Sequence, residues 1–204
     1  MLRRAIHSIS ESGLVLGVCG LDGRLPVVQV RQEGLLREGV VEDARLLRIN
    51  WKNGISSCLD ELGHHEEALE LKKEIYHTMK ELTPNCIDFV GAGLSVVIVL
   101  SKLKRHAEAK SFLSEHLPLA RRIAGPDHEL ILRLEFERAE AIYGVSQQKF
   151  GGKIGAKDYR EALNIVEDVH RRRLRVFGAD HPLTRSVVQT LNSLRSHRQI
   201  VNEK

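Results

Sequence analysis

The sequence predicts an all-α protein, a solenoid of about three stacked helical hairpins with a C-terminal capping helix. A Glu-Ala pair occurs three times, and a residue that ends helices stands sixteen positions after each alanine, as in 84 − 68 = 16. The pairs are Glu67-Ala68, Glu108-Ala109 and Glu161-Ala162, and the ends are Pro84, Gly125 and Gly178. Apolar residues between these points recur with the 3.6-residue period of a helix, so the chain is predicted to be a helical repeat array.

The composition agrees with stacked helices. The 204 residues are 42% hydrophobic, 4% aromatic and 28% charged, a balance typical of helices that pack through aliphatic side chains and carry charges outside. The net charge of +4 is too mild to indicate a nucleic-acid-binding stripe, so a solvated basic surface is favoured over polyanion binding. The longest apolar stretch, Val96 to Leu100, is far shorter than the roughly 20 residues of a membrane span, and we expect no membrane association.

The three cysteines, Cys19, Cys58 and Cys86, form no CxxC pair, which argues against a zinc site or a disulfide framework. Cys58 falls on the apolar side of a predicted helix, where we expect a small buried thiol. Free thiols suit a reducing compartment, so we expect an intracellular, cytoplasmic protein. Import into an organelle is the alternative, because the first nine residues begin basic and place apolar residues at helical spacing.

Residues 1–40 are predicted to be an N-terminal extension. Stretches rich in β-branched residues stand on either side of Gly20-Leu21-Asp22-Gly23, which predicts a short strand, a turn and a second strand. A lone pair of strands is marginally stable, so the extension is expected to form a small β-hairpin, a targeting segment or a poorly ordered segment.

Residues 41–204 are predicted to form the helical repeat domain, with hairpins at about 43–83, 87–124 and 129–177 and a capping helix at 183–198. The first helix is expected to pack through one apolar face, made of Leu47, Trp51, Ile55, Cys58, Leu59 and Leu62. The third hairpin is longer than the others. Its extra residues are predicted to form a flexible loop at 147–157, because this segment contains three glycines.

The junctions of the hairpins share recurring sequences. The turns read Gly63-His64-His65-Glu66-Glu67-Ala68 and Asp158-Tyr159-Arg160-Glu161-Ala162, and the ends read Gly125-Pro126-Asp127-His128 and Gly178-Ala179-Asp180-His181-Pro182. Over about residues 43–198, this pattern resembles tetratricopeptide repeats of the kinesin light chain type. The first ending departs from the family pattern, and no heptad coiled coil for a motor heavy chain is present. The resemblance implies a non-enzymatic scaffold for protein–protein interaction rather than a motor subunit.

The resemblance also implies where a partner would bind. In the related family, first helices line a concave groove, and paired asparagines there bond the backbone of an extended peptide. The matching positions in this sequence are Asn53 and Gly54, Leu94 and Ser95, and Gln189 and Thr190. Only Asn53 keeps the asparagine, so the ligand is expected to differ from the family's acidic and aromatic peptides. The predicted partner-binding residues are Asn53, Ser95, Gln189 and Thr190, and the alternative is that they are ordinary solvated positions.

A basic cluster is the sharpest charge feature of the sequence, and it consists of Arg171, Arg172, Arg173 and Arg175. It stands near the C-terminal end of a predicted helix, where each cation is favoured by about 0.3–1 kcal/mol. The rival interpretation is a docking site for an acidic protein surface or RNA.

No catalytic, cofactor-binding or metal-binding residue is predicted, because the serines, histidines and acids form no nucleophile elbow and no cofactor or metal motif. His64, His65 and His106 fall at equivalent turns, where solvated histidines are favoured over a metal site. His128 and His181 are expected to bond neighbouring backbone. The sequence does not predict the oligomeric state.

Overall fold

The computed structural model describes residues 15–16, 28–29, 38–196 and 200–201. The chain divides into two compact units, Met1–Arg48 and Ile49–Lys204. In the first unit, β1 (Val15–Leu16) pairs antiparallel with β2 (Val28–Gln29), in the order that the sequence predicts. The proposed targeting segment and the predicted turn at 20–23 lie outside the described residues. Helix α2 (Glu38–Glu61) begins in the first unit and continues into the second.

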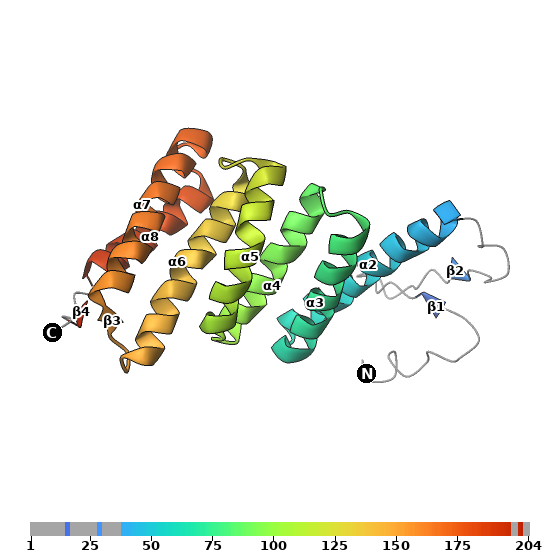
Figure 1. The fold of residues 1–204 in the computed structure, drawn as a ribbon, viewed down its shortest axis with the longest axis horizontal. Coiled ribbons are helices and arrows are strands. Elements are labelled where there is room, and N and C mark those ends of the chain that lie inside the picture. The colour runs from blue at the N-terminus through green and yellow to red at the C-terminus, as the bar shows by residue number, and fades with distance from the viewer. Residues whose placement is uncertain (1–14, 17–27, 30–37, 197–199, 202–204) are drawn as a thin grey trace. The chain divides into compact units, whose positions relative to one another are not determined.

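The second unit continues with six helices that follow one another in a row of antiparallel neighbours (Figure 1). They are α3 (His65–Leu82), α4 (Ile87–Lys102), α5 (His106–Ala124), α6 (Glu129–Lys149), α7 (Ala156–Phe177) and α8 (Pro182–Ser196). Each of these helices packs on the next, and α4 also packs on α6. This is the predicted all-α solenoid of hairpins.

The repeated Glu-Ala signal has a packing explanation. Ala68, Ala109 and Ala162 are each essentially inaccessible to solvent, at the place where the second helix of a hairpin meets its neighbours. A methyl group at this point permits close approach of two helices. The ends of α5 and α7 are set by Gly125 and Gly178, which both have a φ of +83°, a conformation that favours glycine.

The histidines of the two Asp-His endings cap the helices that follow them. His128 Nδ1 accepts a hydrogen bond from the backbone N–H of Leu130 at 3.2 Å, and His181 Nδ1 accepts one from Leu183 at 3.3 Å. The expectation that these side chains bond neighbouring backbone is therefore confirmed. An N-terminal cap satisfies a backbone donor that has no partner within the helix, so the recurring ending specifies the start of the next helix.

The connection between α6 and α7 differs from the predicted flexible loop. Helix α6 extends to Lys149 and α7 begins at Ala156, so only 150–155 connect them. Gly151 and Gly152 turn the chain with φ values of +59° and +91°. Strand β3 (Ile154–Gly155) is buried and pairs parallel with β4 (Ile200–Val201), and the Gly155 N–H donates to Ser146 Oγ at 2.9 Å. The glycines suggested a flexible loop, but this connection is held by the pairing of β3 with β4 and by the hydrogen bond to Ser146.

Most of the apolar face predicted for α2 is exposed, and only Trp51 and Leu59 of its members are half-buried. Ile55 is 49% exposed, Leu62 is 58% exposed and Cys58 is exposed, so the expectation of a buried thiol is wrong. Among the residues of this helix whose burial is described, Ile49 and Ser56 are buried, and they lie on the opposite face. The periodicity identified an amphipathic helix correctly, but hydrophobicity alone did not indicate which of its faces is buried.

Two glycines allow imidazole rings to lie directly on neighbouring helices. His116 of α5 lies where a Cβ on Gly93 of α4 would stand 2.1 Å from its Nε2 atom. His106 lies in the same way against Gly144 of α6, with 2.4 Å to its ring. His106 is therefore packed against a helix, whereas the sequence predicted a solvated side chain. Burial lowers the pKa of His106, and the charge of Lys104 lowers it further.

Candidate functional site: a groove across three helices

The described part of the chain contains a cavity of about 270 Å³ where α6, α7 and α8 meet. Its lining consists of Ala139, Glu140, Tyr143, Ala162, Val166, Gln189, Thr190, Ser193 and Leu194. Helix α7 packs against both α6 and α8, and its side chains contribute to the floor of the space between those two helices. We call this cavity the α6–α8 groove.

The α6–α8 groove has an apolar floor and a polar rim. Ala139, Ala162, Val166 and Leu194 are buried members of the hydrophobic core that α6, α7 and α8 share. Gln189 is exposed, and Thr190 is half-buried. A concave apolar surface with a few polar groups at its edge is the usual form of a binding site, because the floor supplies hydrophobic contact and the rim supplies orientation.

One carboxylate lines the groove. Glu140 is half-buried, and burial raises the pKa of this carboxyl, with a further increase from the charge of Glu137 one turn earlier. Burial also raises the pKa of Glu137. The hydrogen bond that Ser101 Oγ donates to Glu137 at 3.0 Å acts in the opposite direction and lowers this pKa. Among the described residues, no cation forms an ion pair with Glu140. The described part of the chain therefore supplies no direct partner for this carboxylate.

The structure brings together two of the four predicted partner-binding residues. Gln189 and Thr190 both line the α6–α8 groove. Asn53 is exposed on α2, and its backbone carbonyl accepts bonds from Ser56 and Ser57. Ser95 is half-buried on α4, and its hydroxyl donates to the Gly91 carbonyl at 3.0 Å.

The sequence interpretation missed the contribution of α6, including Glu140 and Tyr143. Gln189 and Thr190 stand eight and nine residues after His181, so the same offsets from His128 lead to Phe136 and Glu137. Those positions are one turn from the residues that line the groove. The insertion after α6 changes the distance between this helix and the turn alanine Ala162, so counting back from the alanine does not locate the matching positions. Counting forward from the Asp-His ending at His128 could have located them.

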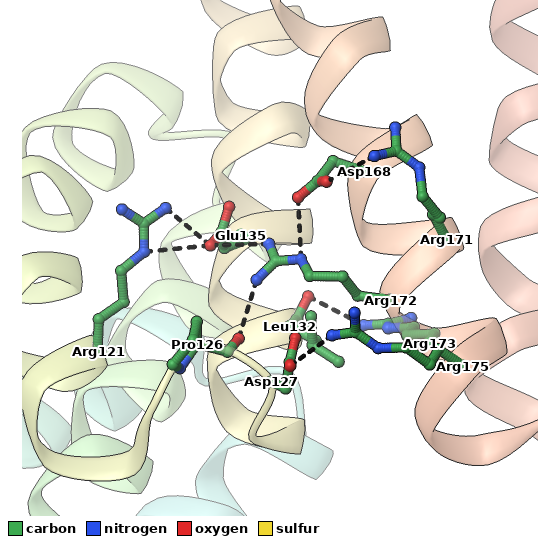
Figure 2. A network of polar contacts seen from close by, with 10 residues as sticks. All are labelled: Arg121, Pro126, Asp127, Leu132, Glu135, Asp168, Arg171, Arg172, Arg173 and Arg175. Atoms are coloured by element: carbon green, nitrogen blue, oxygen red, sulfur yellow. Dashed lines mark hydrogen bonds and ion pairs between the residues drawn. The ribbon is translucent and has the colours of Figure 1, made fainter.

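The basic cluster does not form a single exposed patch (Figure 2). Arg171 is 77% exposed and Arg175 is 67% exposed, whereas the side chain of Arg172 is 15% exposed and Arg173 is 2% exposed. Arg175 pairs with Asp127, and Arg171 lies 3.6 Å from Asp168. The cluster thus divides into two exposed and two internal arginines.

Glu135 is the centre of the internal network. Figure 2 shows Arg121 of α5 and Arg172 of α7 reaching this buried carboxylate of α6 from opposite sides, at 2.7 and 3.0 Å. Arg172 also pairs with Asp168 at 2.9 Å and donates to the Pro126 carbonyl at 2.9 Å. A carboxylate with two guanidinium partners links three successive helices.

Arg173 links α7 to both neighbouring helices. Its guanidinium donates to the Leu183 carbonyl of α8 at 2.8 Å and to the Leu132 carbonyl of α6 at 3.2 Å. It also lies over the Phe136 ring, 5.5 Å from the centroid. Burial lowers the pKa of Arg173 to about 10, so the side chain is still charged at neutral pH.

Comparisons with known proteins agree with the fold of successive helical hairpins. A tetratricopeptide repeat family model matches residues 155–183, which contain α7 and the ending that follows it. The fold is similar to a crystal structure of nearly identical tetratricopeptide-like repeats assigned to a kinesin light chain of Podosopora anserina, with a TM-score of 0.58 and 16% identity. That match covers 72% of this chain, and it spans 65% of the solved chain, just under two thirds of its length. No curated protein matches the sequence.

Residues 155–183 therefore correspond to a tetratricopeptide repeat, and the described helices have a tetratricopeptide-like fold. This fold is similar to that of kinesin light chain repeats, as the junction sequences predicted. Within the described ranges, no helix has both the length and the apolar character that crossing a membrane requires.

Proposed function

We propose that this protein is a non-enzymatic scaffold that binds an extended segment of a partner protein in the α6–α8 groove. Tetratricopeptide repeats generally serve as scaffolds for protein–protein interaction. The observation that carries the proposal is the cavity of about 270 Å³, which combines an apolar floor with the predicted residues Gln189 and Thr190. An extended peptide has unpaired backbone amides, and polar side chains at a groove rim are suited to bind them.

The test uses peptides selected from a displayed random library against the full chain. Thr190→Tyr would place an aromatic ring in the groove, and we expect it to weaken the selected peptides at least about tenfold, measured by fluorescence titration. Thr78→Tyr is the matched control, because Thr78 is half-buried on α3 and outside the groove. Peptides that bind both variants as tightly as the wild type would show that the groove is not the binding site.

The basic cluster provides the competing interpretation, and salt separates the two. Binding in the groove should tolerate moderate salt, whereas phosphate binding weakens steeply as salt rises. The charge-reversal variant for this comparison is Arg171→Glu with Arg175→Glu, because those two side chains are exposed. Arg172 and Arg173 are unsuitable, since their contacts link helices. A steep salt dependence that the double variant abolishes would favour an adaptor for acidic surfaces or nucleic acid.

A further inference from the structure

Among the described residues, the carboxylate at the rim of the α6–α8 groove has no oppositely charged partner. Glu140 lines the cavity, and the arginines nearby on the same helices have other partners. Arg138 bonds Glu161 at 3.0 Å, and Arg195 bonds Glu167 at 2.8 Å. The like charge of Glu137 acts on Glu140 and raises the pKa of its carboxyl, in addition to the effect of burial. A half-buried carboxylate in these surroundings is complementary to a cation brought by a ligand.

The size and lining of the groove restrict what can bring that cation. A volume of about 270 Å³ is below the range of roughly 300–1,000 Å³ that drug-sized ligands occupy. It therefore suits one long side chain rather than a bulky ligand. The floor between Glu140 and α8 is made of Ala162, Val166 and Leu194, which offer no polar partner. Lysine and arginine combine an apolar stem with a charged end, and they bury the stem while the charge meets a polar group.

We propose that the α6–α8 groove recognises a lysine or arginine side chain in the extended partner segment. The stem lies on Ala162 and Val166, the cation pairs with Glu140, and Gln189 and Thr190 contact the backbone on either side. This inference rests on the proposed function, because it names the chemistry of the ligand that the same groove binds. The partner is therefore a basic segment, in contrast to an acidic one.

The experiment compares peptide selections on the full-length wild type and on Glu140→Gln, which removes the charge and keeps the shape. The control is Glu81→Gln, which makes the same chemical change at an exposed position on α3. We expect the wild type and the control to enrich lysine or arginine at one fixed peptide position. We expect Glu140→Gln to lose that preference.

A titration with one selected peptide then isolates the contact. Replacing its basic residue by norleucine, which keeps the stem and removes the charge, should weaken binding to the wild type about tenfold. The same replacement should have little effect on binding to Glu140→Gln, as expected for two groups that interact directly.

The outcomes separate the two proposals. Selected peptides that Thr190→Tyr blocks but that lack a basic position would overturn the basic-segment inference and leave groove binding intact. Enrichment of acidic peptides would overturn it as well. If Thr190→Tyr blocks none of the selected peptides, both proposals fail together.

Discussion

Arg173 is the least exposed lysine or arginine among the described residues, and its contacts give it a structural role. Its neighbours Arg171 and Arg172 differ from it in environment because successive helix residues point about 100° apart. Arg171 faces solvent, Arg172 faces Glu135, and Arg173 faces the seam between α6 and α8. The run of arginines was visible in the sequence, but its division depends on which helices lie on either side.

Arg173→Ala is expected to lower the free energy of unfolding by about 3 kcal/mol. The substitution removes two hydrogen bonds from a charged donor and the packing of the side-chain stem on Phe136. Urea denaturation at pH 7 measures the change. Arg171→Ala is the control, and it should change stability by less than about 0.5 kcal/mol because that side chain is exposed. Equal effects of the two substitutions would contradict the role given to Arg173.

At the scale of single elements, α4 carries two glycines in different environments. A Cβ at Gly93 would stand 2.1 Å from Nε2 of His116, and that ring is held by Tyr76, Phe89 and Phe112 around it. A Cβ at Gly91 would meet nothing within 4 Å. The two positions share a helix and a residue type, so they differ mainly in the space available.

Gly93→Ala is expected to destabilise the protein by about 2 kcal/mol, because the imidazole and the helix must move apart. Gly91→Ala is expected to stabilise it by about 0.5–1 kcal/mol, because alanine favours the helix. Thermal or urea unfolding of both variants provides the comparison. In a His116→Ala background the penalty at Gly93 should largely disappear, and a penalty that persists would assign it to something other than the ring.

The sequence predicted elements better than their contacts. The phase of the hairpins followed from Ala68, Ala109 and Ala162, because the positions that demand a small residue are also the points where helices meet. The orientation of α2 did not follow, since Ile55 and Leu62 form an apolar face that the neighbouring helices leave exposed. Only two of the nine residues that line the candidate site, Gln189 and Thr190, were predicted, for a similar reason. Gln189 follows the repeat pattern, whereas Glu140 lies on a helix whose offset the insertion obscured.

At the scale of the whole molecule, buried titratable groups set how stability depends on pH. Burial lowers the pKa of His116 to about 4. The charge of Lys80 also lowers this pKa, whereas a hydrogen bond with the backbone of Val90 raises it. In the unfolded chain a histidine titrates near 6.5, so between pH 6.5 and about 4 the unfolded state binds a proton that the folded state does not. The stability due to this residue is present above pH 6.5 and is lost as the pH falls through that window.

Other groups oppose or reinforce this effect. Burial lowers the pKa of His106, so its contribution has the same sign as that of His116. Burial raises the pKa of Glu137 and Glu140, so their contribution decreases as the pH rises through and above their unfolded value near 4.5. The net profile is a sum of opposing terms, and a single substitution is needed to isolate one of them.

His116→Asn is expected to reduce the loss of stability between pH 7 and pH 5 by about 2 kcal/mol relative to the wild type. Asparagine can place a polar atom near the position of Nδ1, which lies 3.2 Å from the Tyr76 hydroxyl. Urea denaturation at the two pH values measures the difference. His64→Asn, at an exposed turn, should keep the wild-type loss, and an equal loss in both variants would exclude His116 as the source.

The α6–α8 groove crosses the seam between the third hairpin and α8, and this position links ligand affinity to local folding. If α8 undocks in a fraction of molecules, the groove is incomplete in that fraction, and the apparent affinity falls in proportion. A bound ligand in turn shifts the docking equilibrium of α8 by mass action. Occupancy of the groove would then be visible in amides that the ligand never touches, as slower hydrogen exchange along α8.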